Sequence, residues 1–366
     1  MKTPSILSIG RRAALMVSFA VAVHGAGDEP YLLQKAEITA LASKAARALN
    51  APIETITAKP RHSPSGDDHD YVSYARYYWP DPGKPDGLPF INRDGRHNLE
   101  QVAQGDHERL WKFAETVEAL AAAWKMRRDP VASRRAGEWL RAWLVDPKTR
   151  LNPNLEFAQI RLGHDGNHGS SSGVLDGRCL AGVVDAVRLL HDSSALTPGD
   201  EATIRDWFVR YLSWLETARN ARTEHAARNN HGSWFLAQMI PIARFCGRDD
   251  LARSLCAEDR ERIGWQIRPD GSQPAEIRRV DGLGYSQFNL EAQFQIARQA
   301  AGLGLDLWHY AAPEGGSLQR AFEFLAPYNA HPEKWPTGQK AKLVPGFMDA
   351  LAKDAALAWP EGTRKS

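Results

Sequence analysis

Apolar residues recur along this chain at spacings of three and four, which is the pattern of amphipathic helices. One such face is formed by Leu110, Phe113, Val117, Leu120 and Trp124. Another is formed by Ile204, Trp207, Phe208, Tyr211, Leu212 and Leu215. Further helices are predicted near 31–48, 131–145, 173–191, 233–246, 249–266, 287–303, 316–328 and 346–358. Strand-like alternation is scarce, so we expect an all-α protein of about ten helices.

The helix boundaries favour short connections between antiparallel neighbours. Thr197, Pro198 and Asp200 supply a cap, a first-turn proline and a first-turn acid for the helix that follows. Gly- and Pro-rich turns separate the helices, and the chain contains 12 Trp. We therefore predict an incomplete (α/α) toroid of about five to seven helical hairpins. A plain helical bundle or a solenoid is the alternative, although no repeat of fixed period is found.

Two irregular segments, 57–104 and 150–172, interrupt the helical pattern. Loops of this length inside a compact domain are usually functional or disordered. The first segment carries five aromatic residues within nine positions, which argues against disorder: Tyr71, Tyr74, Tyr77, Tyr78 and Trp79. We expect both segments to be long functional loops on the toroid.

The N-terminus has the pattern of a signal peptide. Lys2, Arg11 and Arg12 precede an apolar run over 13–23, and small residues follow near Gly25. We expect residues 1–26 to be removed on export to the periplasm, leaving 27–366 as one toroid domain. No stretch reaches the roughly 18 apolar residues that a membrane span needs, so no membrane association is expected after cleavage.

Composition narrows the partners and cofactors. The 46 Lys and Arg balance 44 Asp and Glu, and a formal charge of +2 gives no reason to propose nucleic acid. Cys246 and Cys256 can pair in an oxidising compartment, or stay as isolated thiols like Cys179. Several histidines lie close together in sequence, but no cysteine or carboxylate cluster completes a site. We expect no metal and no cofactor, and the oligomeric state stays open.

The first candidate chemical motif is Asn229-Asn230-His231. Consecutive asparagines suit a helix start, so a capping role is one interpretation. The other interpretation places the Asn230 amide and the His231 ring at a helix N-terminus, where backbone N–H groups favour an anion. Both roles are compatible.

The second motif runs from Glu276 through Arg278 and Arg279 to Tyr285. The arginines can pair with neighbouring acids, which is the structural interpretation. The functional interpretation joins the phenol and the guanidinium groups to the first motif. Such a donor-rich set suits a reaction that holds negative charge on an oxygen while a proton leaves the adjacent carbon, as in elimination next to a uronate carboxylate.

These motifs together resemble the alginate-lyase superfamily of α/α-toroid polysaccharide lyases. The resemblance rests on Asn-Asn-His-x-x-Trp ending at Trp234, on Glu-x-x-Arg with a tyrosine six residues beyond, and on the segments 77–82 and 86–89. Asn152-Pro153-Asn154, Gln159 and Gly177-Arg178 also match, so the resemblance covers about 58–292.

The resemblance implies roles for individual residues. Asn230 and His231 would neutralise the uronate carboxylate, an arginine would assist, and Tyr285 would transfer the proton. The Glu-x-x-Arg register selects Arg279, while members with one more residue before the tyrosine would select Arg278. Substrate contacts are expected from Asn229, Trp234, Arg278, Gln159, Asn154, Tyr77, Tyr78 and Trp79.

The implied reaction is β-elimination on an anionic uronate polysaccharide. Mannuronate-rich alginate is the first choice and a β-1,4-glucuronan the second, because the two uronates differ at C2, away from the reacting atoms. Either Tyr285 serves as both base and acid, or His231 is the base and Tyr285 the acid. Two alternatives stay open. One is an α/α-toroid glycoside hydrolase, whose catalytic carboxylates would come from candidates such as Asp165, Asp176, Glu276 and Asp281. The other is a periplasmic protein that only binds uronate polymers.

Overall fold

The computed structural model describes residues 31–59 and 61–360, so the expected signal peptide over 1–26 lies outside the described residues. In this range the α-helices are α1 (Lys35–Ala42), α2 (Ala45–Leu49), α3 (Leu99–Val102), α4 (His107–Arg127), α5 (Pro130–Leu140), α6 (Leu180–Leu189), α7 (Pro198–Thr217), α8 (Arg219–His225), α9 (Asn230–Phe245), α10 (Asp249–Gln266), α11 (Pro274–Ile277), α12 (Gly282–Gly302), α13 (Leu318–Leu325) and α14 (Asp349–Ala358).

The remaining elements are short. The strands are β1 (Val72–Tyr74), β2 (Tyr78–Trp79), β3 (Ile91–Asn92) and β4 (Phe157–Ile160). A π-helical turn, η1 (Arg141–Val145), continues α5. The 3₁₀ turns are η2 (Asp165–Asn167), η3 (Ser171–Cys179), η4 (Ala326–Tyr328) and η5 (Pro332–Lys334).

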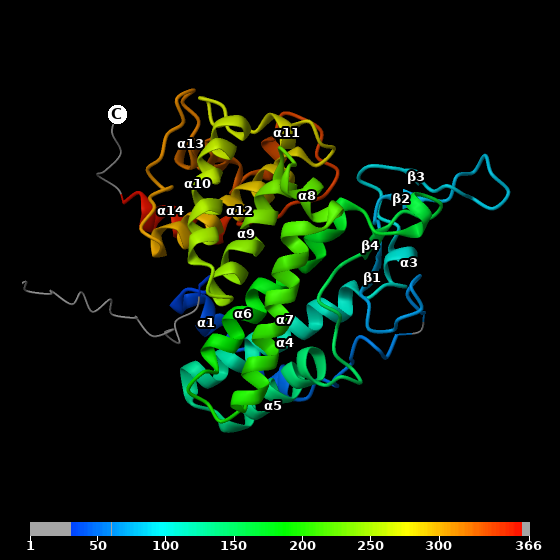
Figure 1. Cartoon of the computed structure of the whole chain (residues 1–366). Helices are drawn as coiled ribbons and strands as arrows, with labels where there is room; N and C mark the ends of the chain where they lie inside the picture. Colours follow the sequence, from blue (N-terminus) through cyan, green and yellow to red (C-terminus); the bar gives the residue numbers. More distant parts are fainter. Residues whose placement is uncertain (1–30, 60, 361–366) are drawn as a thin grey trace, which may run out of the picture.

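The helices form the layered arc of an incomplete α/α toroid, which confirms the expected fold class (Figure 1). Four helices pack in succession, α4 against α6, α6 against α9, and α9 against α12. Other helices cover them, with α1 and α5 against α4, α7 and α10 against α9, and α13 against α12. The strands and α3 lie together on one side of the helical body in Figure 1.

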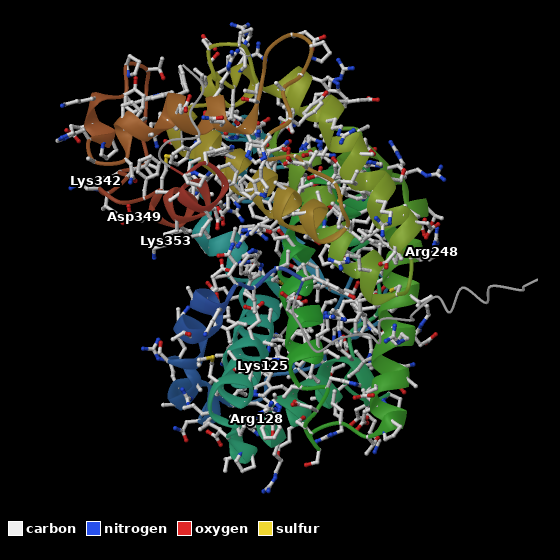
Figure 2. The ribbon with its side chains drawn as sticks, turned by 90° about the vertical axis from the view of Figure 1, so that its left-hand side faces the viewer. Lys125, Arg128, Arg248, Lys342, Asp349 and Lys353 are labelled. Atoms are coloured by element: carbon white, nitrogen blue, oxygen red, sulfur yellow. The ribbon has the colours of Figure 1, made fainter. Side chains whose placement is uncertain are left out.

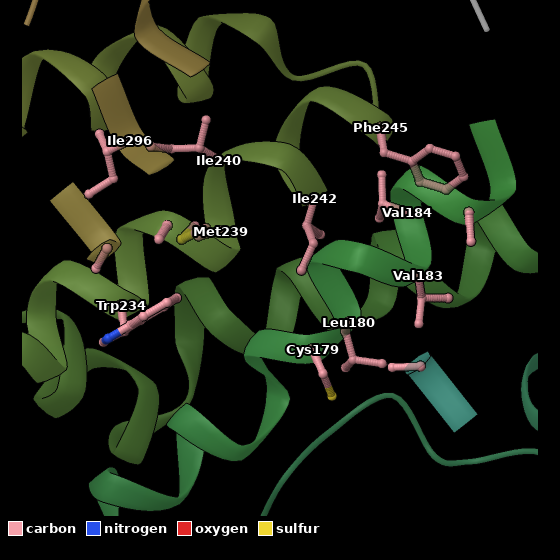
Figure 3. Close-up of a cluster of buried hydrophobic side chains, with 14 of the residues drawn as sticks. Cys179, Leu180, Val183, Val184, Trp234, Met239, Ile240, Ile242, Phe245 and Ile296 are labelled. Atoms are coloured by element: carbon pink, nitrogen blue, oxygen red, sulfur yellow. The ribbon is translucent and has the colours of Figure 1, made fainter. Parts of the chain in front are cut away.

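The apolar faces predicted from the sequence point into one large core. Leu110, Phe113, Val117 and Leu120 of α4 are all 0% exposed. Phe113 stacks on Trp143 with 4.6 Å between ring centroids. Figure 3 shows part of this core between α6, α9 and α12, with labelled side chains that include Leu180, Val183, Val184, Met239, Ile240, Ile242, Phe245 and Ile296. Burial of these faces fixes the positions of the helices that carry the site.

Local signals explain where the key helices begin. The Thr197 hydroxyl accepts from Asp200 N and Asp200 bonds back to Thr197 N, so α7 begins with the expected capping box. The Asn229 side chain accepts from His231 N at 3.1 Å and caps α9. This helix begins at Asn230, three residues before the start expected from apolar periodicity. The capping interpretation of Asn229 therefore holds.

The two long irregular segments are joined by β-structure. β1 runs parallel to β4, pairing Val72 with Phe157 and Tyr74 with Ile160. β2 and β3 form a small antiparallel pair within the first segment. The buried Asp176 carboxylate of η3 accepts from Tyr71 Oη at 2.9 Å and Ser73 Oγ at 2.6 Å. Both loops are thus fixed against the helical body.

The first described residues are held on the opposite part of the fold by Asp185 of α6. This side chain is 0% exposed and accepts from the backbone N–H groups of Tyr31, Leu32 and Leu33 at 2.7–2.9 Å. Burial raises the pKa of Asp185 to about 6, and the three backbone hydrogen bonds oppose that shift. The carboxylate therefore ties the N-terminal segment to the toroid.

Two further expectations concern thiols and membranes. Cys179, Cys246 and Cys256 are all free thiols, so the pairing of Cys246 with Cys256 does not occur. Within 31–59 and 61–360, no helix is both long and apolar enough to cross a bilayer.

We predict that Asp185→Ala lowers the free energy of unfolding by about 3 kcal/mol, because hydrogen bonds to a buried carboxylate are lost and partly buried N–H groups remain unpaired. Urea denaturation measures the effect. Asp192→Ala is the control, since its pairing with Arg128 is exposed and worth at most about 1 kcal/mol. Equal losses in both variants would contradict the anchoring role.

Candidate active site

A cavity of about 740 Å³ lies where the long loops meet the starts of α9 and α12. The four residues expected to be catalytic, Asn230, His231, Arg279 and Tyr285, all line it. Asn230 and His231 open α9, Tyr285 is in the first turn of α12, and Arg279 lies between α11 and α12. Positive ends of two helix dipoles therefore face the same space, which favours an anionic ligand.

Asn230 is held by Glu276. The Glu276 carboxylate accepts from Asn230 N at 2.7 Å and from Asn230 Nδ2 at 2.6 Å, and both residues are 1% exposed. Burial raises the pKa of Glu276, against the effect of these bonds and of the neighbouring His231 and Arg279. One N–H of the Asn230 amide is thus committed to Glu276, and the amide carries one further N–H.

His231 has its own carboxylate partner. Nδ1 lies 2.5 Å from Glu224 Oε1, and the Glu224 side chain is 3% exposed. Burial raises the pKa of Glu224, and the hydrogen bond and charge of His231 oppose it. When Glu224 is ionised its carboxylate only accepts, so Nδ1 is the donor in this contact and Nε2 is the ring nitrogen left to act on a ligand.

Arg279 connects the first long loop to Tyr285. Its guanidinium donates to Asp94 through Nε at 3.2 Å and through Nη2 at 2.8 Å. Nη2 also donates to Tyr285 Oη at 2.9 Å, and the guanidinium carbon lies 3.9 Å from the centroid of the Tyr285 ring. The hydrogen bond from Arg279 holds the pKa of Asp94 below its usual value. Arg279 is therefore held between Asp94 on one side and Tyr285 on the other.

Tyr285 belongs to a pair of phenols. Its Oη lies 2.8 Å from the Oη of Tyr77, and either hydroxyl can be the donor. Burial raises the pKa of Tyr285 well above its ordinary value, and Tyr77 adds to this shift. The charge of Arg279 favours the phenolate, but its effect on the pKa is outweighed. Tyr285 is accordingly a protonated phenol at neutral pH.

The opposite wall comes from the second long loop and η3. Gln159 lines the cavity, but its Nε2 already donates to Asp176 Oδ1 at 2.9 Å. Arg178, also a lining residue, has its guanidinium carbon 4.4 Å from the ring centroid of Trp111 and 5.4 Å from those of Trp234 and Phe288. Burial lowers the pKa of Arg178 from its high ordinary value. The cavity thus contains, besides Arg279, a guanidinium group that is held by aromatic faces.

Other residues expected to contact substrate lie in different places. Tyr77 and Tyr78 line the cavity, whereas Asn229, Trp234, Arg278, Asn154 and Trp79 are not among its lining residues. Trp234 is 5% exposed and donates to Phe288 O, so it packs beneath the wall. Trp79 donates to Arg96 O, and Asn154 accepts from Glu156 N. Arg278 is exposed.

Several lining or supporting residues were not assigned roles from the sequence. Asp94, Arg76 and Arg161 lie in the long loops and line the cavity, and Glu224 supports His231. Arg178 was noted only as part of the resemblance. Of these residues, only Glu224 lies close enough in sequence to its partner to have been predicted. It is seven residues before His231, at the end of α8, and His231 lies at the start of α9.

The carboxylates considered for a hydrolase each bind other groups of the protein. Glu276 binds Asn230, and Asp176 binds Tyr71, Ser73 and Gln159. Asp281 Oδ1 accepts from Lys340 N and Ala341 N. Asp165 pairs with Arg161 at 2.5 Å. In the described part of the chain, no group of three or more His, Cys, Asp or Glu residues is arranged to hold a metal ion.

Comparisons with known proteins agree with this arrangement. The family model described as alginate lyase matches residues 55–335. The crystal structure of an alginate lyase from Bacteroides ovatus shares 33% identity and a TM-score of 0.81, covering 88% of this chain and 84% of that chain. Among curated proteins, none matches the chain.

More distant structures share the fold. A histidine-to-alanine variant of alginate lyase A1-III in its apo form gives a TM-score of 0.58 at 16% identity, covering 92% of this chain and 90% of that chain. The same variant complexed with a tetrasaccharide gives 0.51 at 17% identity, covering 84% and 78%.

The helical toroid and its matches define an enzyme of the polysaccharide lyase class. More specifically, the chain belongs to the alginate lyase family, whose model spans more than half of its length. The expectations of a lyase and of this family are confirmed. The glycoside hydrolase and the binding protein without activity are set aside.

We predict that Asp94→Asn lowers kcat/KM about tenfold, because Arg279 loses the charge that orients it. Lyase activity is measured as the ultraviolet absorbance of the new double bond. Asp86→Asn, an exposed change in the same long loop, should retain full activity. If both variants behave alike, Asp94 does not position Arg279.

Proposed function

We propose that this enzyme cleaves uronate polysaccharides by β-elimination, with mannuronate-rich alginate as the first substrate and β-1,4-glucuronan as the second. The observation that carries the proposal is the contact between Arg279 and Tyr285 Oη at 2.9 Å, in a cavity that Asn230 and His231 also line. The relative from Bacteroides ovatus is an alginate lyase, which favours alginate over the glucuronan.

The donors suit the difficult step of the reaction. Removing H5 from a uronate places further negative charge on a carboxylate that is already charged. The Asn230 amide and the Arg279 guanidinium can donate to these oxygens, as can Nε2 of His231 when the ring is doubly protonated, and their partners Glu276, Asp94 and Glu224 hold them in place before reaction. Such preorganised donors stabilise developing charge by several kcal/mol.

Tyr285 transfers the proton in this proposal. Its phenolate takes H5, the C4–O4 bond breaks as the C4–C5 double bond forms, and the phenol returns the proton to the leaving O4. In mannuronate and glucuronate H5 and O4 lie on the same face, so one residue serves both steps. The raised pKa of Tyr285 supports the acid step directly. The base step requires the Tyr285 phenol to lose its own proton first, and Arg279 is the neighbour that favours the resulting phenolate.

His231 offers a second assignment. Glu224 on Nδ1 leaves Nε2 as a base, and a protonated Tyr285 is ready to act as the acid. This pairing suits guluronate, in which H5 and O4 lie on opposite faces. A panel of polymannuronate, polyguluronate, glucuronan and hyaluronan separates the substrates.

Between the two arginines we assign the catalytic role to Arg279. It contacts Tyr285 and lines the cavity, whereas Arg278 is exposed. We assign substrate binding to Tyr77, Tyr78 and Gln159 as cavity residues, and a supporting role to Asn229 and Trp234. We further propose that residues 1–26 direct export to the periplasm, and that 27–366 act there as one domain.

We predict that Tyr285→Phe lowers kcat about a thousandfold and leaves substrate binding nearly unchanged, because the proton carrier is lost while the other donors remain. Steady-state kinetics and calorimetric titration with a mannuronate oligomer measure the two effects. Tyr310→Phe, outside the cavity lining, is the matched control. Normal turnover by Tyr285→Phe would remove this residue from the mechanism.

A second experiment decides which residue is the base. A uronate with fluoride at C4 needs no acid, because fluoride leaves without protonation. If Tyr285 takes H5, Tyr285→Phe is inactive on this substrate as well. If His231 takes H5, Tyr285→Phe recovers elimination on the fluoride while His231→Ala does not.

A further inference from the structure

A segment near the C-terminus, 336–347, contributes part of the cavity wall. It connects Trp335 and Met348, which are buried at 8% and 1% exposure. Gln339, Ala341 and Leu343 line the cavity together with the catalytic residues. The match to the alginate lyase family model ends at residue 335, so this wall is supplied by a part of the chain outside that match.

Asp281 fixes the segment to the start of α12. Its Oδ1 atom accepts from Lys340 N at 2.8 Å and from Ala341 N at 2.6 Å. Gln339 Oε1 accepts in turn from Leu283 N at 3.2 Å, and Asp281 forms an isolated antiparallel bridge with Gln339. The Asp281 carboxylate, the Gln339 amide and the backbone bridge thus set the position of the segment relative to α12.

The segment approaches both Tyr285 and the loop that holds Arg279. A Cβ added at Gly284, beside Tyr285, would lie 3.7 Å from Gln339 Nε2 and 4.0 Å from Leu343 Cδ2. A Cβ at Gly95, beside Asp94, would lie 3.8 Å from Lys340 Cδ. Gly95 has φ +70, and a Cβ there would also lie 2.6 Å from Val280 Cγ2, so only glycine fits where the two segments contact each other.

We propose that residues 339–343 form a specificity-determining wall for the sugar bound next to Tyr285, with the apolar faces of Ala341 and Leu343 packed on its C–H groups and Asp281 positioning them. The inference rests on the proposed function, since the ligand is a uronate oligomer. Neighbouring Lys340 and Lys342 are exposed and add positive charge beside the wall. Figure 2 shows Lys342 on the same side of the molecule as Asp349.

Leu343→Ala tests the contact with the sugar. We expect KM for mannuronate tetramer to rise about tenfold, with kcat within about twofold, because apolar contact is lost without a change in the reacting groups. Val344→Ala is the matched control, since Val344 is 61% exposed and does not line the cavity. Equal KM values for these two variants overturn the proposed contact.

Asp281 variants test the positioning. Asp281→Asn keeps an Oδ1 acceptor and should retain the wild-type KM and product lengths, whereas Asp281→Ala should raise KM and shift the lengths of the released oligomers. Asp349→Ala, a carboxylate that binds Asn329 away from the cavity, controls for general loosening of the C-terminal part. Thermal melting of each variant separates loss of the wall from loss of the fold.

The outcomes distinguish the two proposals. If the wild-type enzyme shows no elimination on any uronate polymer, the proposed function fails. If it is active but Leu343→Ala and folded Asp281→Ala match the wild type in KM and product length, only the wall is refuted.

Discussion

The hydrogen bonds from Asn230 to the buried Glu276 carboxylate are the interaction on which the geometry of the site depends. They join the start of α9 to α11 through two residues that are 46 positions apart in sequence. A buried carboxylate is tolerated only when it is well bonded, so neither partner can move alone. Because Arg279 lies three residues and Tyr285 nine residues after Glu276, this pair also helps to set the positions of the guanidinium and the phenol relative to His231.

The same arrangement recurs around the cavity. Asn230, His231 and Arg279 each have one acidic partner, and each partner approaches from a different element. The acids hold the donors in place, but the negative charge of the acids also offsets part of the positive potential of the donors. The net attraction for an anionic polymer therefore depends on cations with no such partner in direct contact, of which Arg178 in its aromatic surroundings is the clearest described case.

Much of the fold could be predicted because it depends on local patterns. The periodic faces of α4 and α7 and the capping box at Thr197 are visible within a few residues. The starts of α9 and α12 were placed three and five residues late, since both helices begin with polar or glycine residues before their apolar faces. The strands β1 to β4 contain two to four residues each, too few to show alternation.

The candidate site was predictable only where its residues lie close in sequence. Asn230 with His231, and Arg279 with Tyr285, form short motifs. Asp94 lies 185 residues from Arg279, and Tyr77 lies 208 residues from Tyr285, so no spacing could link them. Trp234 belongs to a motif yet packs under Arg178, because the helical turn that presents His231 to the cavity directs the indole into the core.

The anchoring of both long loops on Asp176 has a consequence for how this enzyme can be changed. Tyr71 and Ser73 from one loop and Gln159 from the other share a single carboxylate, and β1 pairs with β4 beside it. Groups that share one partner respond non-additively to substitution. If only one loop were exchanged with that of a relative, Asp176 would lose hydrogen bonds that match the other loop. Redesign of the cavity therefore requires exchanging the two segments together.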